Sequence, residues 1–208
     1  MAGGERYELP PERLGAWLDR WADAHGGVRE TTASDALVTL VAADGAVVEC
    51  EPPFPPVQGD LVAHAARERV VGVLLVRLGG HAAGVFRGTR LLDSKVGARP
   101  VHGRNRKGGS SSGRFARRRA GQARVALAAA VDVAVRVLRE PAEAGSLDAV
   151  VLGGDRSALE TVLADARLAA VRELAVARVL DVGDPRLRVL QATPELFRVT
   201  VVRVSPSP

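Results

Sequence analysis

The sequence predicts a mixed α/β (α+β) fold, in which a small N-terminal lobe of one helix and a β-hairpin precedes the main domain. First, 47% of the 208 residues are hydrophobic, which is enough for the core of one ordinary domain. Second, three strand-like segments separated by glycine turns are followed by alternating helical and strand-like segments, which predicts a mixed sheet covered by helices. Third, the proline-rich segment 51–56 divides the chain into these two parts.

The N-terminal lobe is expected to span residues 1–56. Its helix begins after Pro10 and ends before Gly26, because proline favours the first turn of a helix and glycine favours its end. The apolar side chains follow helical spacing and form one stripe, in which the two tryptophans are interpreted as core anchors: Leu14, Trp17, Leu18 and Trp21. Two strands at 36–41 and 46–50 then flank an Asp-Gly turn, which predicts a hairpin.

The main domain is expected to span residues 57–204. It begins with a three-stranded antiparallel meander at 70–78, 81–86 and 90–96, whose first strand is nearly continuously apolar, as expected for a strand buried on both faces. A long helix follows at 114–138. The remaining elements, in order, are a strand at 147–152, a helix at 157–164 opening with the capping box Ser157-Ala-Leu-Glu160, an ambiguous segment at 172–180, a short helix at 184–191, a final strand at 197–204 and a disordered tail at 205–208.

This order of elements is that of ribonuclease-H-like folds, but the carboxylates of a two-metal nuclease are missing. The first strand contains no acid, and the long helix offers only Asp132, far from its start. Asp148 and Asp155 alone cannot build such a site. The four histidines are scattered and have no cysteine partners, so neither a metal nor another cofactor is expected. A serine hydrolase using Ser111 with His81 or His102 would lack a nucleophile elbow and an acid partner.

Composition also indicates a cytoplasmic protein. The N-terminus has no apolar stretch typical of a signal peptide, and no segment approaches the roughly 18 apolar residues of a membrane span. The single cysteine, Cys50, cannot form an internal disulfide and is expected to be a buried, unreactive thiol.

Charge is distributed unevenly along the chain. Overall there are 29 basic and 24 acidic residues, but no acidic residue lies between Asp93 and Asp132. Ten cations lie there: Lys95, Arg99, Arg104, Arg106, Lys107, Arg114, Arg117, Arg118, Arg119 and Arg124. A solvated surface usually mixes both signs of charge, whereas an unmixed basic stretch indicates a polyanionic partner. We therefore interpret residues 95–124 as a nucleic-acid-binding surface.

The start of the long helix supports this interpretation. Arginines in the first turns of a helix are disfavoured by the helix dipole by about 0.3–1 kcal/mol each, and a phosphate bound there would relieve this repulsion. The preceding segment 108–113, Gly-Gly-Ser-Ser-Ser-Gly, would be a flexible linker if met in isolation. Between dense cations and a helix start, its glycines instead allow the backbone to approach a ligand closely.

Several segments together resemble the VLRF family of release-factor-like peptidyl-tRNA hydrolases, in its actinobacterial branch. The segments are Gly72–His81, Ser94–Arg99, Gly103-Arg104, Lys107–Gly109, Arg114–Arg119 and Gln122–Arg124, with support from Arg13–Asp19 and Pro52–Pro55. The resemblance implies a fold like the middle domain of release factors. It also implies a role in ribosome rescue and quality control, with the large ribosomal subunit and peptidyl-tRNA as partners. In the family, a Gly-Gly loop promotes hydrolysis of the ester between the nascent peptide and tRNA.

The resemblance assigns the catalytic loop to Gly108, Gly109, Ser110, Ser111 and Ser112, and RNA contacts to the ten cations. The family places a glutamine shortly after the paired glycines to position the attacking water, whereas this chain has serines and no glutamine before Gln122. A serine hydroxyl donates and accepts hydrogen bonds but is shorter than a carboxamide. Three alternatives follow: a weakened hydrolase, a hydrolase that uses Ser111 or Ser112, or an inactive loop on a factor that only binds the ribosome.

Overall fold

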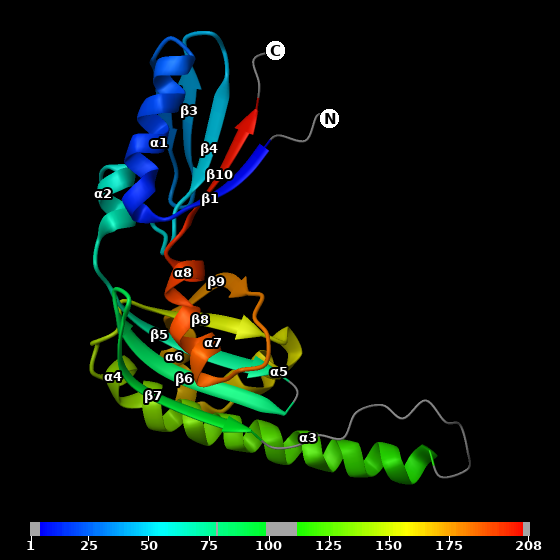
Figure 1. The fold of residues 1–208 in the computed structure, drawn as a ribbon. Helices are drawn as coiled ribbons and strands as arrows, with labels where there is room; N and C mark the ends of the chain where they lie inside the picture. Colours follow the sequence, from blue (N-terminus) through cyan, green and yellow to red (C-terminus); the bar gives the residue numbers. More distant parts are fainter. Residues whose placement is uncertain (1–4, 78, 99–111, 206–208) are drawn as a thin grey trace. The chain divides into compact units, whose positions relative to one another are not determined.

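The computed structural model describes residues 5–77, 79–98 and 112–205, and for 112–119 only the backbone. Within it the chain forms two compact units, one comprising residues up to Glu68 together with those from Glu195 onwards, and the other comprising Arg69–Pro194. Each unit has its own five-stranded sheet (Figure 1).

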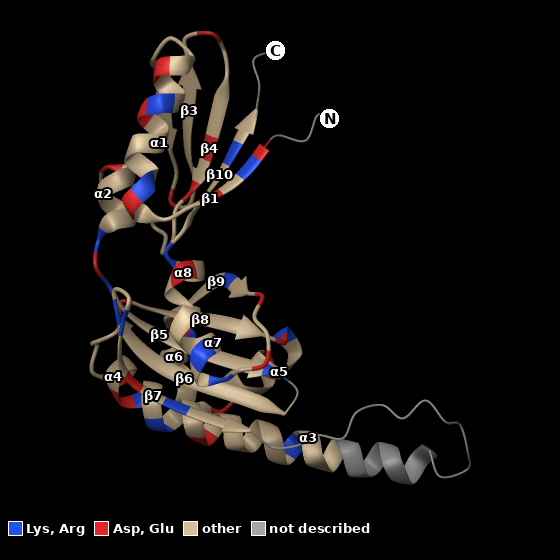
Figure 2. Ribbon diagram, viewed as in Figure 1, with Lys and Arg blue, Asp and Glu red and all other residues tan. Residues whose placement is uncertain are grey.

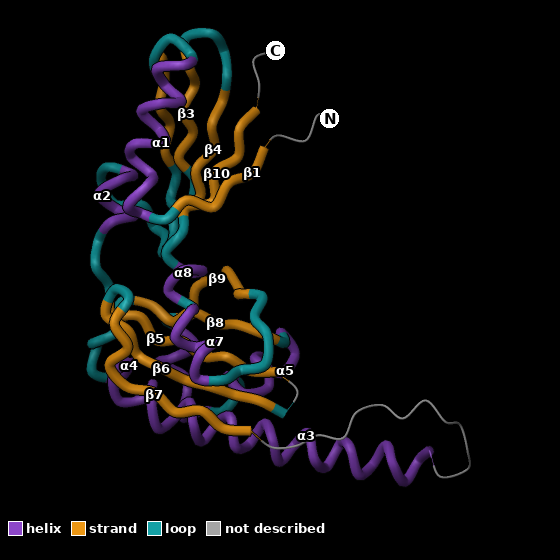
Figure 3. Tube along the Cα trace, in the orientation of Figure 1, coloured by secondary structure: helices purple, strands orange, loops and turns teal. Residues whose placement is uncertain are grey.

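The first unit is an antiparallel sheet with two helices on one face (Figure 3). Its elements are β1 (Glu5–Leu9), α1 (Pro11–Ala24), β2 (Val28–Ala33), β3 (Val38–Ala42), β4 (Val47–Glu51), α2 (Leu61–Ala66) and β10 (Thr200–Ser205). The strands lie in the order β1-β10-β4-β3-β2. The predicted helix and hairpin are confirmed, and Leu14 and Trp21 are buried in the core with Trp17 and Leu18 packed against it. Cys50 is fully buried, as predicted.

The second unit is a mixed sheet between helices. Its elements are β5 (Val70–Arg77), β6 (Gly80–Arg87), β7 (Arg90–Ala98), α3 (Ser112–Ala134), a π-helical turn (Val135–Arg139), α4 (Glu140–Glu143), β8 (Ala149–Gly154), α5 (Arg156–Leu163), a 3₁₀ turn (Ala166–Leu168), α6 (Ala169–Glu173), β9 (Ala175–Leu180) and α7 (Leu187–Ala192). The short helix α8 (Pro194–Phe197) starts at the last residue of this unit, and its other residues belong to the first unit. The strand order is β7-β6-β5-β8-β9, with β8 parallel to both neighbours. The predicted mixed sheet and its antiparallel meander are confirmed.

Helices cover both faces of this sheet. Buried side chains of α3, α5 and α6 pack with Leu74, Val76, Ala83 and Val85 in one continuous core. Because side chains alternate along a strand, Gly84 faces the opposite side, where a Cβ added to it would lie 3.1 Å from Leu190 of α7. This arrangement buries β5 from Val71 to Val76, which explains the unbroken apolar segment.

The observed division of the chain differs from the predicted boundaries of 1–56 and 57–204. The segment 57–68 belongs to the first unit because Leu61 and Ala65 of α2 are buried in the same core as α1. The last strand, predicted in the main domain, is β10, which inserts between β1 and β4 of the first unit. Ser205, predicted in the tail, ends this strand, and 206–208 lie outside the described residues.

Local details also differ from the prediction. The N-cap of α5 is Asp155, whose carboxylate accepts a hydrogen bond from the amide of Ala158, so Ser157 is already helical rather than a capping residue. The ambiguous segment divides into the helix α6 and the edge strand β9.

Candidate nucleic-acid interface

The predicted basic stretch begins on β7 and ends on α3. The last registered pairs of β6 and β7 are His81 with Gly97 and Gly80 with Ala98, and α3 starts at Ser112. Figure 1 shows α3 lying along the sheet. In the sequence, the segment 99–111 therefore joins two elements that pack on each other.

Gly97 and His81 form a close contact at the base of that segment. His81 is only 3% exposed, and a Cβ added at Gly97 would lie 2.3 Å from its Nε2 atom and 2.9 Å from its Cε1 atom. Such distances are far below van der Waals contact, so the imidazole lies directly against the backbone of Gly97. Glycine is therefore required for this packing at the end of β7.

Small side chains bring α3 close to the sheet. Ala126, Ala130 and Ala134 are buried, and their spacing of four residues places them on one face of the helix. Arg124 and Val125 precede this face and are exposed, Val125 to 55%. The helix thus presents a basic residue to solvent immediately before its buried part.

The described cations of the predicted interface are Lys95 and Arg124. Both side chains are exposed, one on β7 and one on α3, and Figure 2 shows basic segments on both elements. Five further predicted site residues belong to the first part of α3, where the structure describes only the backbone: Ser112, Arg114, Arg117, Arg118 and Arg119. The remaining predicted site residues lie outside the described residues: Arg99, Arg104, Arg106, Lys107, Gly108, Gly109, Ser110 and Ser111.

The acidic residues that border the basic stretch are engaged elsewhere. Asp132 lies 3.4 Å from a guanidinium nitrogen of Arg167, which also pairs with Asp165 at 3.0 Å. Asp93 accepts a hydrogen bond from the amide of Ser94. Neither carboxylate forms an ion pair with Lys95 or Arg124 within the described residues, so both cations are available to an anionic partner.

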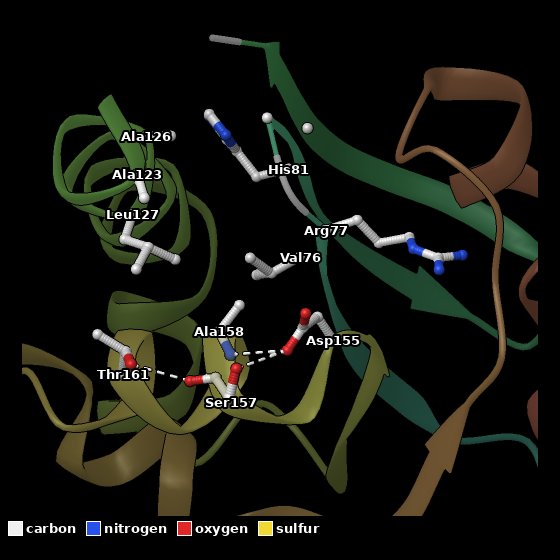
Figure 4. A pocket seen from close by; sticks show the side chains of 12 residues that line it. Val76, Arg77, His81, Ala123, Ala126, Leu127, Asp155, Ser157, Ala158 and Thr161 are labelled. Atoms are coloured by element: carbon white, nitrogen blue, oxygen red, sulfur yellow. Dashed lines mark hydrogen bonds between the residues drawn. The ribbon is translucent and has the colours of Figure 1, made fainter. Parts of the chain in front are cut away.

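A pocket of about 220 Å³ adjoins this interface, between α3, α5 and the turn that joins β5 to β6 (Figure 4). Ala123, Ala126 and Leu127 of α3 line one side, and Asp155, Ser157, Ala158 and Thr161 line the other. Val76, Arg77, Gly79, Gly80 and His81 complete it. Arg77 lines the pocket with its stem, while its Nη1 atom donates a 2.5 Å hydrogen bond to the carbonyl of Val182.

Sequence reasoning did not identify this pocket as a site. Its polar residues follow β8, whose carboxyl end lies beside that of β5 because the two strands are parallel. Crevices at the carboxyl ends of parallel strands are common ligand sites. The Gly153-Gly154-Asp155 turn after a buried strand was therefore the available signal.

Two structural findings bear on other classes of site. Among the described residues no group of three or more His, Cys, Asp or Glu side chains is arranged to hold a metal ion. Within the same residues no helix is long and apolar enough to cross a membrane.

Comparison with known proteins gives one family and a set of similar solved structures. The family described as "Actinobacteria/chloroflexi VLRF1 release factor" matches residues 69–203. The crystal structure of the archaeal translation termination factor aRF1 is similar with 14% identity and a TM-score of 0.48, covering 91% of this chain and 64% of that one. A structure titled "Archaeal protein" is similar with 13% identity and a TM-score of 0.41, covering 89% of this chain and 62% of that one. The chain thus spans less than two thirds of either protein. No curated protein matches it.

Proposed function

The chain belongs to the VLRF1 release-factor family of Actinobacteria and Chloroflexi, and from this membership we propose that it hydrolyses peptidyl-tRNA on the large ribosomal subunit. The proposed reaction cleaves the ester that joins a nascent peptide to tRNA. It would act in the cytoplasm on stalled ribosomes, in rescue and quality control. The family membership itself gives the coarser conclusion of a release-factor-like role in translation.

The observation that supports the proposal is the position of the glycine pair in the sequence, between two elements that carry exposed cations and pack on each other. Gly108 and Gly109 lie in the segment that joins β7 to α3. Ten cations without an acid span 95–124, and the two that are described, Lys95 and Arg124, are exposed. Phosphate contacts of this kind hold a protein on RNA and orient it, so they would bring the glycine pair to the tRNA acceptor end.

The proposed chemistry is attack of water on the ester carbonyl. The water oxygen bonds to the carbonyl carbon, the bond to the ribose oxygen breaks, and that oxygen takes up a proton. Backbone N–H groups of Gly108 and Gly109 would stabilise the charge that develops on the carbonyl oxygen. The hydroxyl of Ser111 or Ser112 would orient the water, the role that the resemblance gives to glutamine.

A second candidate function is a factor that binds the ribosome without hydrolysis. It is favoured by one observation, which is that serines occupy the positions of the family's glutamine. Losing one oriented polar group costs about 10²–10³-fold in rate where that group stabilises the transition state. The basic surface is the same in both candidates, so binding does not distinguish them.

Peptide release from stalled ribosome–nascent-chain complexes distinguishes the two candidates. We expect the wild type to release peptide and Gly109→Ala to bind equally well without release. Ser111→Gln and Ser112→Gln restore a carboxamide and should accelerate release. Binding without release by the wild type, together with release by either glutamine variant, would contradict the active enzyme and support the degenerate factor.

A further inference from the structure

The pocket between α3 and α5 lies beside the proposed RNA-binding surface but takes no part in the proposed hydrolysis. Ala123, which lines it, directly precedes the exposed Arg124. Asp155, Ser157 and Thr161 on the other side are exposed, so the pocket opens to solvent. An RNA phosphate bound at Arg124 would therefore lie near the part of α3 that lines the pocket.

The shape of the pocket suits one planar ring. Its volume of about 220 Å³ is below the roughly 300–1,000 Å³ of pockets for drug-sized ligands. The apolar part of the lining is formed by Ala123, Ala126 and Leu127 on α3, by Ala158 on α5 and by Val76 (Figure 4). Proteins that read RNA commonly hold bases that have left the stack against apolar surfaces of this kind.

The polar side of the pocket offers hydrogen-bond acceptors. Ser157 Oγ donates to Asp155 Oδ1 at 2.8 Å, and Thr161 Oγ1 donates to the carbonyl of Ser157 at 2.8 Å. The hydrogens of both hydroxyls are thus engaged in these two hydrogen bonds, so each hydroxyl oxygen can only accept a hydrogen bond from a ligand. Asp155 Oδ2 makes no hydrogen bond among the described residues and carries negative charge, because hydrogen bonds from Ser157 and Ala158 keep the pKa of this carboxyl low.

A rim of acceptors selects a ligand that donates. Adenine, cytosine and guanine carry an exocyclic amine, which can donate to the carboxylate and the hydroxyl oxygens. Uracil has a carbonyl oxygen where adenine or cytosine has the amine, and the Asp155 carboxylate would repel it. From this chemistry and the adjoining basic helix, we infer that the pocket receives one unstacked, amine-bearing base of the bound RNA. The inference rests on the proposed RNA partner and adds base selection to it.

Fluorescence anisotropy with labelled short RNA tests this inference. The probes are an oligouridine and the same oligomer with one central adenosine or cytidine, compared at one salt concentration. We expect the substituted probes to bind the full chain roughly twofold to tenfold more tightly, the range expected for one added hydrogen bond. If all three probes bind with equal affinity and salt still weakens binding, the pocket does not select a base, and the inference is wrong while the proposed RNA surface stands. Failure of every probe to bind would contradict both.

Two variants locate the preference in the pocket. Asp155→Asn keeps a capping side chain on α5, since asparagine caps about as well as aspartate, but it adds a donor that can pair with the uracil carbonyl. With Asp155→Asn, the preference for the adenosine and cytidine probes over oligouridine should therefore disappear or reverse, while the salt dependence of RNA binding stays the same. Ala123→Leu fills the pocket and should remove the preference, whereas Ala128→Leu, at an exposed position of the same helix, should keep it. A preference that survives Ala123→Leu and Asp155→Asn would place base selection elsewhere and overturn the inference.

Discussion

His81 and Gly97 face each other across β6 and β7 at the point where β7 leaves the sheet, and their contact leads to a prediction about stability. Gly97→Ala would place a Cβ against the buried imidazole, so the ring or the strand has to move. We expect the free energy of unfolding to fall by about 1–3 kcal/mol, as for other overpacked sites. Urea denaturation measures this loss.

A matched glycine provides the control for this variant. Gly121 lies in α3 with open space around its Cα hydrogen, so Gly121→Ala should raise stability by up to about 1 kcal/mol through helix propensity. Adding His81→Ala to Gly97→Ala removes the clashing ring and should recover part of the loss. If Gly97→Ala alone is as stable as the wild type, His81 has room to move and the contact does not hold the end of β7.

Cys50 leads to a prediction about pH. Burial raises the pKa of its thiol from 9.0 to about 12, so the folded chain keeps the thiol protonated where the unfolded chain ionises it. The stabilisation is complete below pH 9 and is lost as the pH rises towards 12, by about 1.4 kcal/mol per pH unit. Relative to Cys50→Ala, the wild type should lose free energy of unfolding over this window. A thiol reagent at pH 8 should modify Cys50 only in denaturant, and rapid modification of the native chain would contradict its burial.

At the scale of single elements, α5 depends on the carboxylate that caps it. Asp155 accepts hydrogen bonds from Ser157 Oγ and the Ala158 amide, which lowers the pKa of its carboxyl. The pKa of this carboxyl is thus lower in the folded chain than in the unfolded chain. The charged cap therefore stabilises the fold fully at a pH above the pKa of the unfolded chain. This stabilisation is lost as the pH falls through the pKa of the folded chain. Asp155→Ala should cost about 1 kcal/mol at pH 7, with a smaller difference in acid. If the difference in melting temperature between Asp155→Ala and the wild type does not change with pH, the charge of Asp155 does not have this role.

Lys95 on the strand β7 and Arg124 on the helix α3 are exposed cations that should contact phosphate. Lys95→Ala and Arg124→Ala should weaken RNA binding similarly for all sequences, and each should reduce the slope of log K against log salt by about one. Arg139→Ala is the control, because Arg139 already pairs with Glu143 at 3.3 Å. If neither variant changes this slope, the phosphate contacts do not involve Lys95 or Arg124.

How far the elements could be predicted depends on whether their pattern is local. The meander and the long helix were predicted because apolar segments and glycine turns mark them directly. Strand β2 was missed because its side chains are all exposed and show no alternation, and β1 because only Leu9 is buried. The basic stretch is contiguous in sequence and can be identified there directly, while its role in binding stays a prediction. For the pocket, the sequence offered only the Gly153-Gly154-Asp155 turn. Its sides come from three separate parts of the chain, which meet through the pairing of β5 with β8 and the packing of α3 on α5.

At the scale of the whole molecule, the chain returns to its first unit after completing the second. β10 pairs with β1 on one side and with β4 on the other, and Val202 is fully buried among the core residues of that unit. No local signal in 197–204 indicates this pairing, because it joins residues about 150 to 200 positions apart. The sheet of the first unit is therefore incomplete until β10 has been made, whereas the sheet of the second unit needs only residues from Arg69 to Pro194.

A chain ending at Pro194 tests this dependence. Removing β10 breaks the ladders to both β1 and β4 and exposes their unpaired backbone groups, so the first unit should unfold. The second unit keeps all five strands and should stay folded. Hydrogen exchange should then show fast exchange in β3 and β4 but native protection in β5, β6 and β8. A chain ending at Ser205, which keeps β10 whole, should be protected in both units. Native protection of β4 in the shorter chain would show that the first unit folds without β10.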